Sequence, residues 1–164
     1  MVSVTRLPSL GPRGEGWVAI QIVLFVLVGL AGFAFPGVLS GPASAIVIGA
    51  GLVLIAVGGT LAAAGFGALR SGDAFTALPR PRAEARQVET GPYRLVRHPI
   101  YGGLILAAVG LALVRGSIPA LAAAGALFVF FDLKRRREEA WLCTRFPTYE
   151  AYRARTRRLI PWVY

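Results

Sequence analysis

The stretch GWVAIQIVLFVLVGLAGFAF, residues 16–35, opens the longest uncharged part of this 164-residue chain. No Asp, Glu, Lys or Arg occurs between Gly16 and Leu69. A small water-soluble domain does not bury so long a run without charges, whereas the hydrocarbon of a bilayer accepts it. The mean hydropathy of the whole chain, +0.61, points the same way. The run therefore predicts membrane spans.

The uncharged run has room for two spans. Trp17 to Phe35 is apolar except for Gln21, and its 19 residues, at about 1.5 Å each, cross the hydrocarbon core once. The motif PGVLSGP (36–42) marks a turn, and Ala43 to Leu69 forms a second span rich in glycine and alanine. These small residues favour close helix packing inside the monomer, with a dimer interface as the open alternative. Because the first run exceeds the apolar core of a signal peptide, we expect it to stay in the mature protein.

Two shorter apolar runs follow, Pro99 to Val114 and Ile118 to Phe131, joined by the tripeptide RGS. They predict a tight helical hairpin whose polar ends reach the membrane interface. The fold class is therefore an all-α integral membrane protein with about four spans and a cytoplasmic C-terminal helical segment. The predicted parts of this single domain, residues 1–164, are two N-terminal spans (1–69), a cytoplasmic loop (70–98), a hairpin (99–133) and cytoplasmic helices (134–164).

The charges decide the expected partners and orientation. The formal net charge is +10, and fifteen of the eighteen basic residues lie in two stretches, Arg70 to Arg97 and Lys134 to Arg158. Because both stretches flank apolar runs, they predict cytoplasmic segments of an inner or plasma membrane protein, with both termini in the cytoplasm. Attraction to anionic lipid headgroups accounts for the charge, so we expect the lipid bilayer and no nucleic acid as partner. With one cysteine, Cys143, no internal disulfide is expected.

The tail KRRREEAWLCTRFPTYEAYRARTRRLIPWVY, residues 134–164, continues the fourth span. We expect its first helix to reach about Arg145, to break at Pro147, and to be followed by a shorter basic amphipathic helix to about Arg158. Aromatic side chains of the tail are expected to seat it against lipid headgroups. These are Trp141, Tyr149, Tyr152 and Trp162.

The motif GPYRLVRHPIYGG, residues 91–103, holds the only histidine, His98. Proline is welcome in the first turn of a helix and disfavours helical backbone before it, so Pro99 should start the third span with His98 at its cap. The imidazole then lies beside free helix-terminal N–H groups, with Tyr93, Arg97 and Tyr101 close in sequence. The cluster is either a binding site or a set of ordinary interfacial anchors.

A second motif, KRRREE, follows the hairpin. On a helix Lys134 lies over Glu138, and Arg135 lies over Glu139, because both pairs are four residues apart. The pairs are either solvated salt bridges or part of a site in which a carboxylate faces the His98 region across the hairpin. Such a carboxylate can accept hydrogen bonds from a ribose diol or an amine, or favour a sulfonium cation. One histidine and one cysteine do not build a usual zinc site, and no metal is expected.

These motifs together resemble those of membrane methyltransferases related to isoprenylcysteine carboxyl methyltransferase and phospholipid methyltransferase. The resemblance covers about residues 83–161 and rests on RHPxY, on the double Glu with Leu142 three residues later, and on Tyr149 and Tyr152 followed by the pair Ile160 and Pro161. It implies a cofactor, S-adenosyl-L-methionine, bound by the C-terminal half without a Rossmann sheet. The implied cofactor residues are Ala85, Arg86, Gln87, Val88, Tyr93, Arg97, His98, Pro99, Ile100, Tyr101, Glu138 and Glu139.

Lys134 and Glu138 are the expected catalytic residues. Lys134 stands where eukaryotic relatives have a substrate-associated arginine, so the charge is kept while the bidentate fork is lost. FP replaces the usual FG pair before Tyr149, with a spacing one residue shorter. The resemblance implies carboxyl O-methylation of a lipophilic acceptor. The alternatives are phospholipid or amine N-methylation, for which His98 could serve as base, and a non-catalytic module that binds anionic lipid. The acceptor and the oligomeric state stay open.

Overall fold

The computed structural model describes residues 8–72, 87–161 and 163–164. These ranges contain helices only, apart from one isolated bridge between Val96 and Arg157, so the all-α prediction is confirmed for them. The helices are α1 (Glu15–Ala34), α2 (Pro42–Ser71), the 3-10 helix η1 (Gly91–Arg94), α3 (Pro99–Val114), α4 (Ile118–Arg145) and α5 (Tyr149–Arg155).

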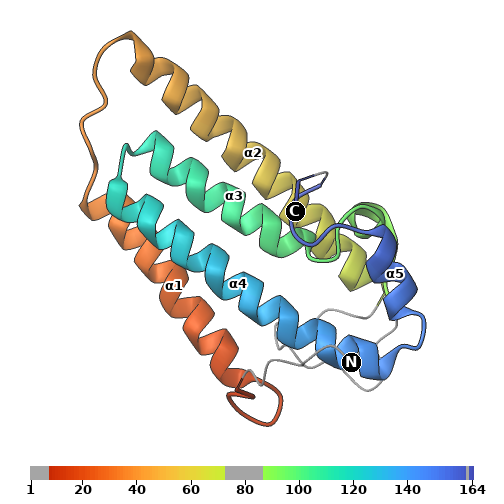
Figure 1. Ribbon diagram of the computed structural model, residues 1–164. Helices are drawn as coiled ribbons and strands as arrows, with labels where there is room; N and C mark the ends of the chain where they lie inside the picture. Colours follow the sequence, from red (N-terminus) through yellow and green to blue (C-terminus); the bar gives the residue numbers. More distant parts are fainter. Residues whose placement is uncertain (1–7, 73–86, 162) are drawn as a thin grey trace.

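The four long helices lie side by side in the order α1, α4, α3, α2 (Figure 1). The predicted hairpin of α3 and α4 therefore fills the space between the two N-terminal helices. The connection from α1 to α2 passes over the turn of this hairpin, where the Gly37 N–H donates to the Arg115 carbonyl at 2.9 Å. Ser117 begins α4 there, with its hydroxyl accepting from the Ala120 N–H and donating to the Ala31 carbonyl of α1.

The N-terminal helices have the properties of membrane spans. Both α1 and α2 are long and apolar enough to cross a bilayer. Their large apolar side chains nevertheless face outward, and Phe33 of α1 is 67% exposed. A helix that is apolar on its exposed face fits lipid better than water. Since α3 and the apolar part of α4, residues 118–131, pack between these helices, they run through the same layer.

Glycines set the spacing between α2 and α3. A Cβ atom at Gly58 would lie 2.4 Å from the Gly103 carbonyl, and one at Gly103 would lie 2.3 Å from the Gly58 carbonyl. Gly51 and Gly110 face each other in the same way. Because backbone cannot move aside as a flexible side chain does, only glycine fits at these positions. The expected close packing within the monomer is confirmed here.

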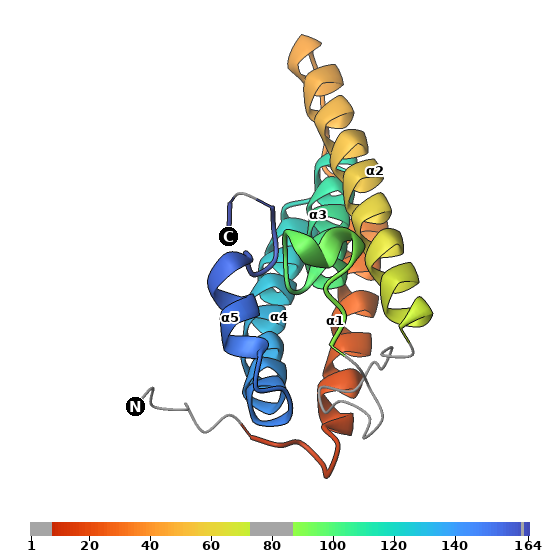
Figure 2. The ribbon, with the colours of Figure 1, turned by 90° about the vertical axis from the view of Figure 1, so that its right-hand side faces the viewer.

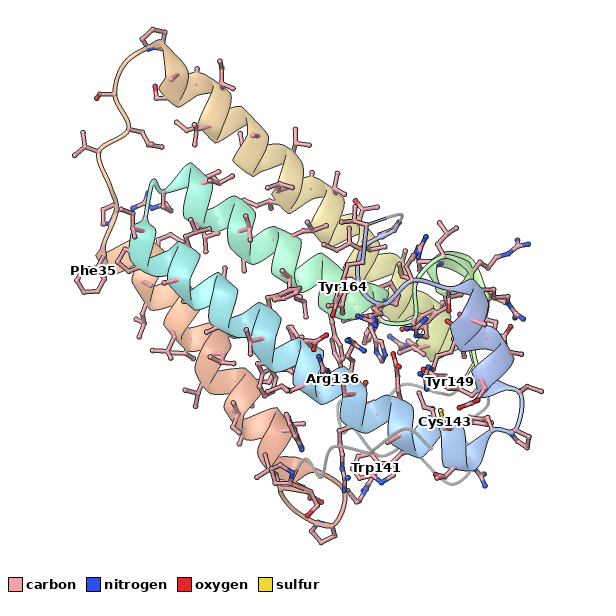
Figure 3. All side chains as sticks on the ribbon, in the orientation of Figure 1. Phe35, Arg136, Trp141, Cys143, Tyr149 and Tyr164 are labelled. Carbon is pink, nitrogen blue, oxygen red and sulfur yellow. The ribbon has the colours of Figure 1, made fainter. Side chains whose placement is uncertain are left out.

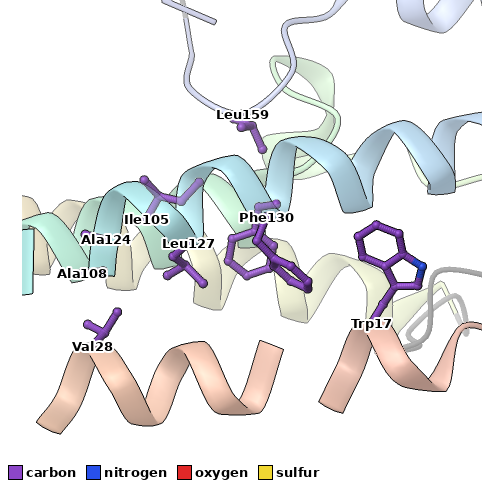
Figure 4. Close-up of a cluster of buried hydrophobic side chains, with 9 residues drawn as sticks. Trp17, Val28, Ile105, Ala108, Ala124, Leu127, Phe130 and Leu159 are labelled. Carbon is purple, nitrogen blue, oxygen red and sulfur yellow. The ribbon is translucent and has the colours of Figure 1, made fainter. Parts of the chain in front are cut away.

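The apolar core lies between α1, α3 and α4 (Figure 4). Trp17 and Val28 of α1 point toward Leu127 and Phe130 of α4. Trp17 and Phe130 are tilted ring partners with centroids 5.7 Å apart. The tail adds the fully buried Leu159 to this core, so the segment after α5 belongs to the folded unit.

The tail differs from its prediction in two respects. As expected, α4 ends at Arg145, but α5 ends at Arg155 rather than near Arg158, and the chain then turns back. Tyr149 and Tyr152 are each 3% exposed, so their expected seating against headgroups is wrong. Trp141 is half-buried, and Trp162 lies outside the described residues. Figure 2 shows α5 and the chain end on one side of the hairpin and α2 on the other.

Candidate functional site

Polar side chains gather where α3 begins, between α4 and α5 (Figure 3). His98 is the N-cap residue of α3, and Pro99 occupies the first turn, as the sequence predicts. The backbone N–H of His98 donates to the Arg158 carbonyl at 3.0 Å. The returning tail therefore fixes the backbone of the histidine, and packing leaves its residue only 7% exposed.

The imidazole of His98 lies between the two glutamates of α4. Its Nδ1 is 3.5 Å from Glu138 Oε2, and its Nε2 is 3.2 Å from Glu139 Oε1. The expected approach of a carboxylate to His98 across the hairpin is thus confirmed. The alternative of a solvated salt bridge is wrong for Glu139, which is 7% exposed.

Glu138 is largely buried, with Tyr101, His98 and Lys134 beside it. Tyr101 donates its hydroxyl to Glu138 Oε1 at 2.5 Å. Burial raises the pKa of the Glu138 carboxyl, and the positive charges of His98 and Lys134 offset only part of this effect. A carboxylate in this setting responds strongly to a further cation or donor placed beside it.

Glu139 is surrounded by cationic groups instead. Arg97 Nε lies 3.0 Å from Glu139 Oε1, and Arg135 and Arg153 each approach one of its oxygens to 3.7 Å. Burial alone would raise the pKa of Glu139, but the contacts with His98 and Arg97 lower it to about 2. Burial therefore dominates the pKa of Glu138, whereas the contacts with His98 and Arg97 outweigh burial at Glu139.

Aromatic rings form a stack beside the carboxylates. His98 and Tyr101 are parallel within 5° with centroids 5.5 Å apart, and Tyr101 stacks on Phe131 at 4.4 Å. Lys134 places its ammonium 5.2 Å from the centroid of the Tyr101 ring. It also donates to Gln21 Oε1 of α1 at 2.5 Å. The stack thus connects the start of α3 to the first span.

With this geometry in place, comparison with known proteins identifies the family. A family model described as phospholipid methyltransferase matches residues 46–148, more than half of the chain. The chain belongs to this family. The match begins within α2, so it extends further toward the N-terminus than the motifs around His98 indicate.

A solved structure of another methyltransferase has a fold similar to that of this chain. It is described as the eukaryotic intramembrane Ras methyltransferase ICMT, isoprenylcysteine carboxyl methyltransferase, without a monobody. The TM-score is 0.65 at 19% sequence identity, over 99% of this chain and 59% of that chain. The present chain therefore spans about three-fifths of that protein. No curated protein sequence matches the chain.

Residues of the motif around His98 also contact other parts of the fold. Arg97 donates to the carbonyls of Arg153 and Thr156 at 2.9 and 2.5 Å, so it binds the C-terminal end of α5 as well as Glu139. Pro99 and Ile100 pack against Gly65 of α2. For these residues the structure gives contacts within the protein, and their cofactor contacts stay a prediction.

The loop before η1 approaches α5 and α2. Thr148 donates to the Gln87 side chain at 3.2 Å, and Val88 packs against Gly72 at the end of α2. Gln87 also donates to the Glu89 carboxylate at 2.5 Å. The remaining predicted loop residues, Ala85 and Arg86, lie outside the described residues.

Sequence reasoning missed three members of the site. Tyr149 and Tyr152 cover it from α5, and the Tyr152 hydroxyl donates to the Tyr93 carbonyl at 2.8 Å. Burial raises the pKa of the Tyr149 hydroxyl well above its usual range. The third is Gln21, which binds Lys134. The sequence could have indicated Gln21 as a site residue, because it is the single polar side chain in its apolar run. For the two tyrosines, the sequence predicts lipid anchors instead.

Proposed function

We propose that the protein is a membrane methyltransferase that uses S-adenosyl-L-methionine and acts on a lipophilic acceptor, as a carboxyl O-methyltransferase. The observation that carries the proposal is the buried junction of His98 with Glu138 and Glu139 in a chain of the phospholipid methyltransferase family. In this proposal both termini face the cytoplasm, the cofactor enters from that side, and the acceptor enters from the bilayer.

The residues at the junction suit this cofactor. The carboxylate of Glu138 can accept from ribose hydroxyls or an amine, and a cation beside it would offset the burial that raises its pKa. The hydroxyl of Tyr101 and the ring of His98 adjoin the same carboxylate. When bound, the cofactor supplies a methyl group that its sulfonium already activates. The protein therefore contributes position and electrostatics more than acid–base chemistry.

Lys134 is the residue that suits a carboxylate acceptor. It is 1% exposed and lies next to Tyr101, on the side of the site that faces α1. A lysine ammonium attracts an anionic group as a point charge and does not impose the planar geometry of arginine. A carboxylate acceptor needs no strong base, which agrees with the two ring nitrogens of His98 both facing carboxylates. His98 accordingly has a positioning role.

The family match supports a second candidate, N-methylation of a phospholipid or another amine. The product distinguishes the two reactions. With radiolabelled cofactor and a lipid extract as acceptor, we expect mild base to release the label as methanol, because a methyl ester hydrolyses and an N-methyl group does not. Label that stays non-volatile after this treatment, whether in the lipid or in its deacylated headgroup, would replace carboxyl O-methylation by N-methylation.

The cofactor site is tested by calorimetric binding of S-adenosylhomocysteine to the full chain in detergent. We expect Glu138→Gln to weaken binding at least tenfold, because hydrogen bonds to a charged partner contribute about 1.5–3 kcal/mol. Glu150→Gln is the matched control, since this carboxylate of α5 is 79% exposed, and it should bind as the unmodified protein does.

Equal affinity of Glu138→Gln and the unmodified chain would remove Glu138 from the site. No binding by the unmodified chain, either in detergent or after reconstitution in lipid nanodiscs, would favour the non-catalytic lipid-binding module over the enzyme.

A further inference from the structure

Two sets of arginines on the predicted cytoplasmic side differ in their partners. Five arginines pair with the carboxylates of Glu89, Asp132 or Glu139, namely Arg97, Arg135, Arg136, Arg153 and Arg155. Three others, Arg94, Arg157 and Arg158, are exposed and have no ion pair within the described part of the chain. The second set therefore carries positive charge that no carboxylate among the described residues neutralises, although Arg158 places its guanidinium 4.8 Å from the centroid of the Tyr164 ring.

These three arginines lie together because two segments are joined through their backbones. The Arg157 N–H donates to the Leu95 carbonyl, and the Arg97 N–H donates to the Arg157 carbonyl, both at 2.9 Å. The Arg158 carbonyl accepts from His98 in the same ladder. We call residues 94–98 with residues 157–161, 163 and 164 the tail staple. It stands directly before Pro99, where α3 enters the membrane layer.

Exposed apolar side chains accompany the unpaired arginines. Leu95 is 47% exposed and Val163 is 77% exposed. The ring of Tyr164, next to Val163, contacts Phe128 in the apolar part of α4 with centroids 5.9 Å apart. The end of the tail has therefore returned to the depth of the fourth span. Val163 is therefore close to the apolar part of α4, and the Arg158 guanidinium lies beside it, 4.8 Å from the centroid of the Tyr164 ring.

An arrangement of this kind matches the layers of a membrane surface. Apolar side chains that face the acyl boundary and basic side chains at headgroup level are the features of an interfacial anchor. Guanidinium groups bind phosphate through paired hydrogen bonds, and the cytoplasmic leaflet is rich in anionic lipid. We propose that the tail staple binds the headgroups of anionic phospholipids in this leaflet. The proposal does not depend on the methyltransferase reaction.

The test measures binding of dioctanoyl phosphatidylglycerol to the full chain in neutral detergent by native mass spectrometry. The double variant Arg94→Gln/Arg157→Gln removes two unpaired arginines of the staple. Each basic residue near an anionic surface raises the binding constant by about a factor of five, so loss of two should weaken binding roughly thirtyfold. Binding of dioctanoyl phosphatidylcholine, which has no net charge, should be weaker in the unmodified chain and should not change in the variant.

The matched control is Arg13→Gln/Arg145→Gln, which removes two exposed arginines outside the tail staple, one just before α1 and one at the end of α4. It should keep the binding of phosphatidylglycerol. An equal loss in both double variants would assign the effect to net charge and overturn the proposed surface, as would unchanged binding in the staple variant. Affinity for S-adenosylhomocysteine is measured in parallel, and we expect neither double variant to change it. The lipid-binding proposal can therefore fail while the proposed cofactor site stands, and the reverse also holds.

Discussion

Replacement of Glu139 by glutamine is expected to lower the free energy of unfolding by about 3–5 kcal/mol, the usual cost of removing one partner from a buried ion pair. Glu139 receives Arg97 and His98 at 3.0 and 3.2 Å, and Arg135 lies 3.7 Å away. All four residues are at most 8% exposed. The variant therefore leaves buried cationic groups without their shared anion. Unfolding by sodium dodecyl sulfate in mixed micelles measures the loss.

The dependence on pH separates the ion pair from simple packing. The pKa of Glu139 falls from 4.5 to about 2 in the folded protein, so its contribution is complete above pH 4.5 and is lost as the pH falls toward 2. The stability difference between the unmodified chain and Glu139→Gln should therefore shrink below pH 4.5. A difference that stays constant down to pH 2.5 would contradict the electrostatic explanation. Glu150→Gln, exposed on α5, should remain within about 0.5 kcal/mol at every pH.

The parts of the fold that sequence predicted well are those that depend on local patterns. The charge-free run fixes α1 and α2, because no water-soluble alternative buries it, and Pro99 fixes the start of α3 through its own backbone restrictions. The approach of Glu138 to His98 was also predictable, since a hairpin returns the chain to the side from which it started.

The path of the tail was not predictable in this way. Tyr149 and Tyr152 have the composition of membrane anchors, and only the fold shows that α5 turns them inward. The reason is a set of long-range contacts. Arg97 binds carbonyls at the end of α5, and the backbone beside it pairs with Arg157. Such contacts join residues about sixty positions apart, and helical periodicity carries no information about them.

The two glycines that end GPYRLVRHPIYGG contact different parts of the fold, and the sequence does not predict these contacts either. Gly103 admits the backbone of α2 at Gly58, as described above. Gly102 admits the tail, because a Cβ atom there would lie 1.9 Å from the Leu159 carbonyl oxygen. Leu159 is fully buried, and its neighbour Arg158 accepts the hydrogen bond from His98. The tail can therefore lie against His98 only if residue 102 has no side chain.

Gly102→Ala is accordingly expected to displace the tail and to cost about 3 kcal/mol of stability, at the upper end for an overpacked site, although alanine is the better helix former. Affinity for S-adenosylhomocysteine should fall at least tenfold, since His98 loses its backbone support. Hydrogen exchange locates the change, because the amides of Arg97 and His98 donate to the tail and should lose protection. Gly125→Ala on α4 is the control, as its Cβ meets no described atom within 4 Å and should leave exchange unchanged. Full protection of both amides in Gly102→Ala would mean that the tail accommodates a methyl group and that its contact with α3 does not hold His98 in place.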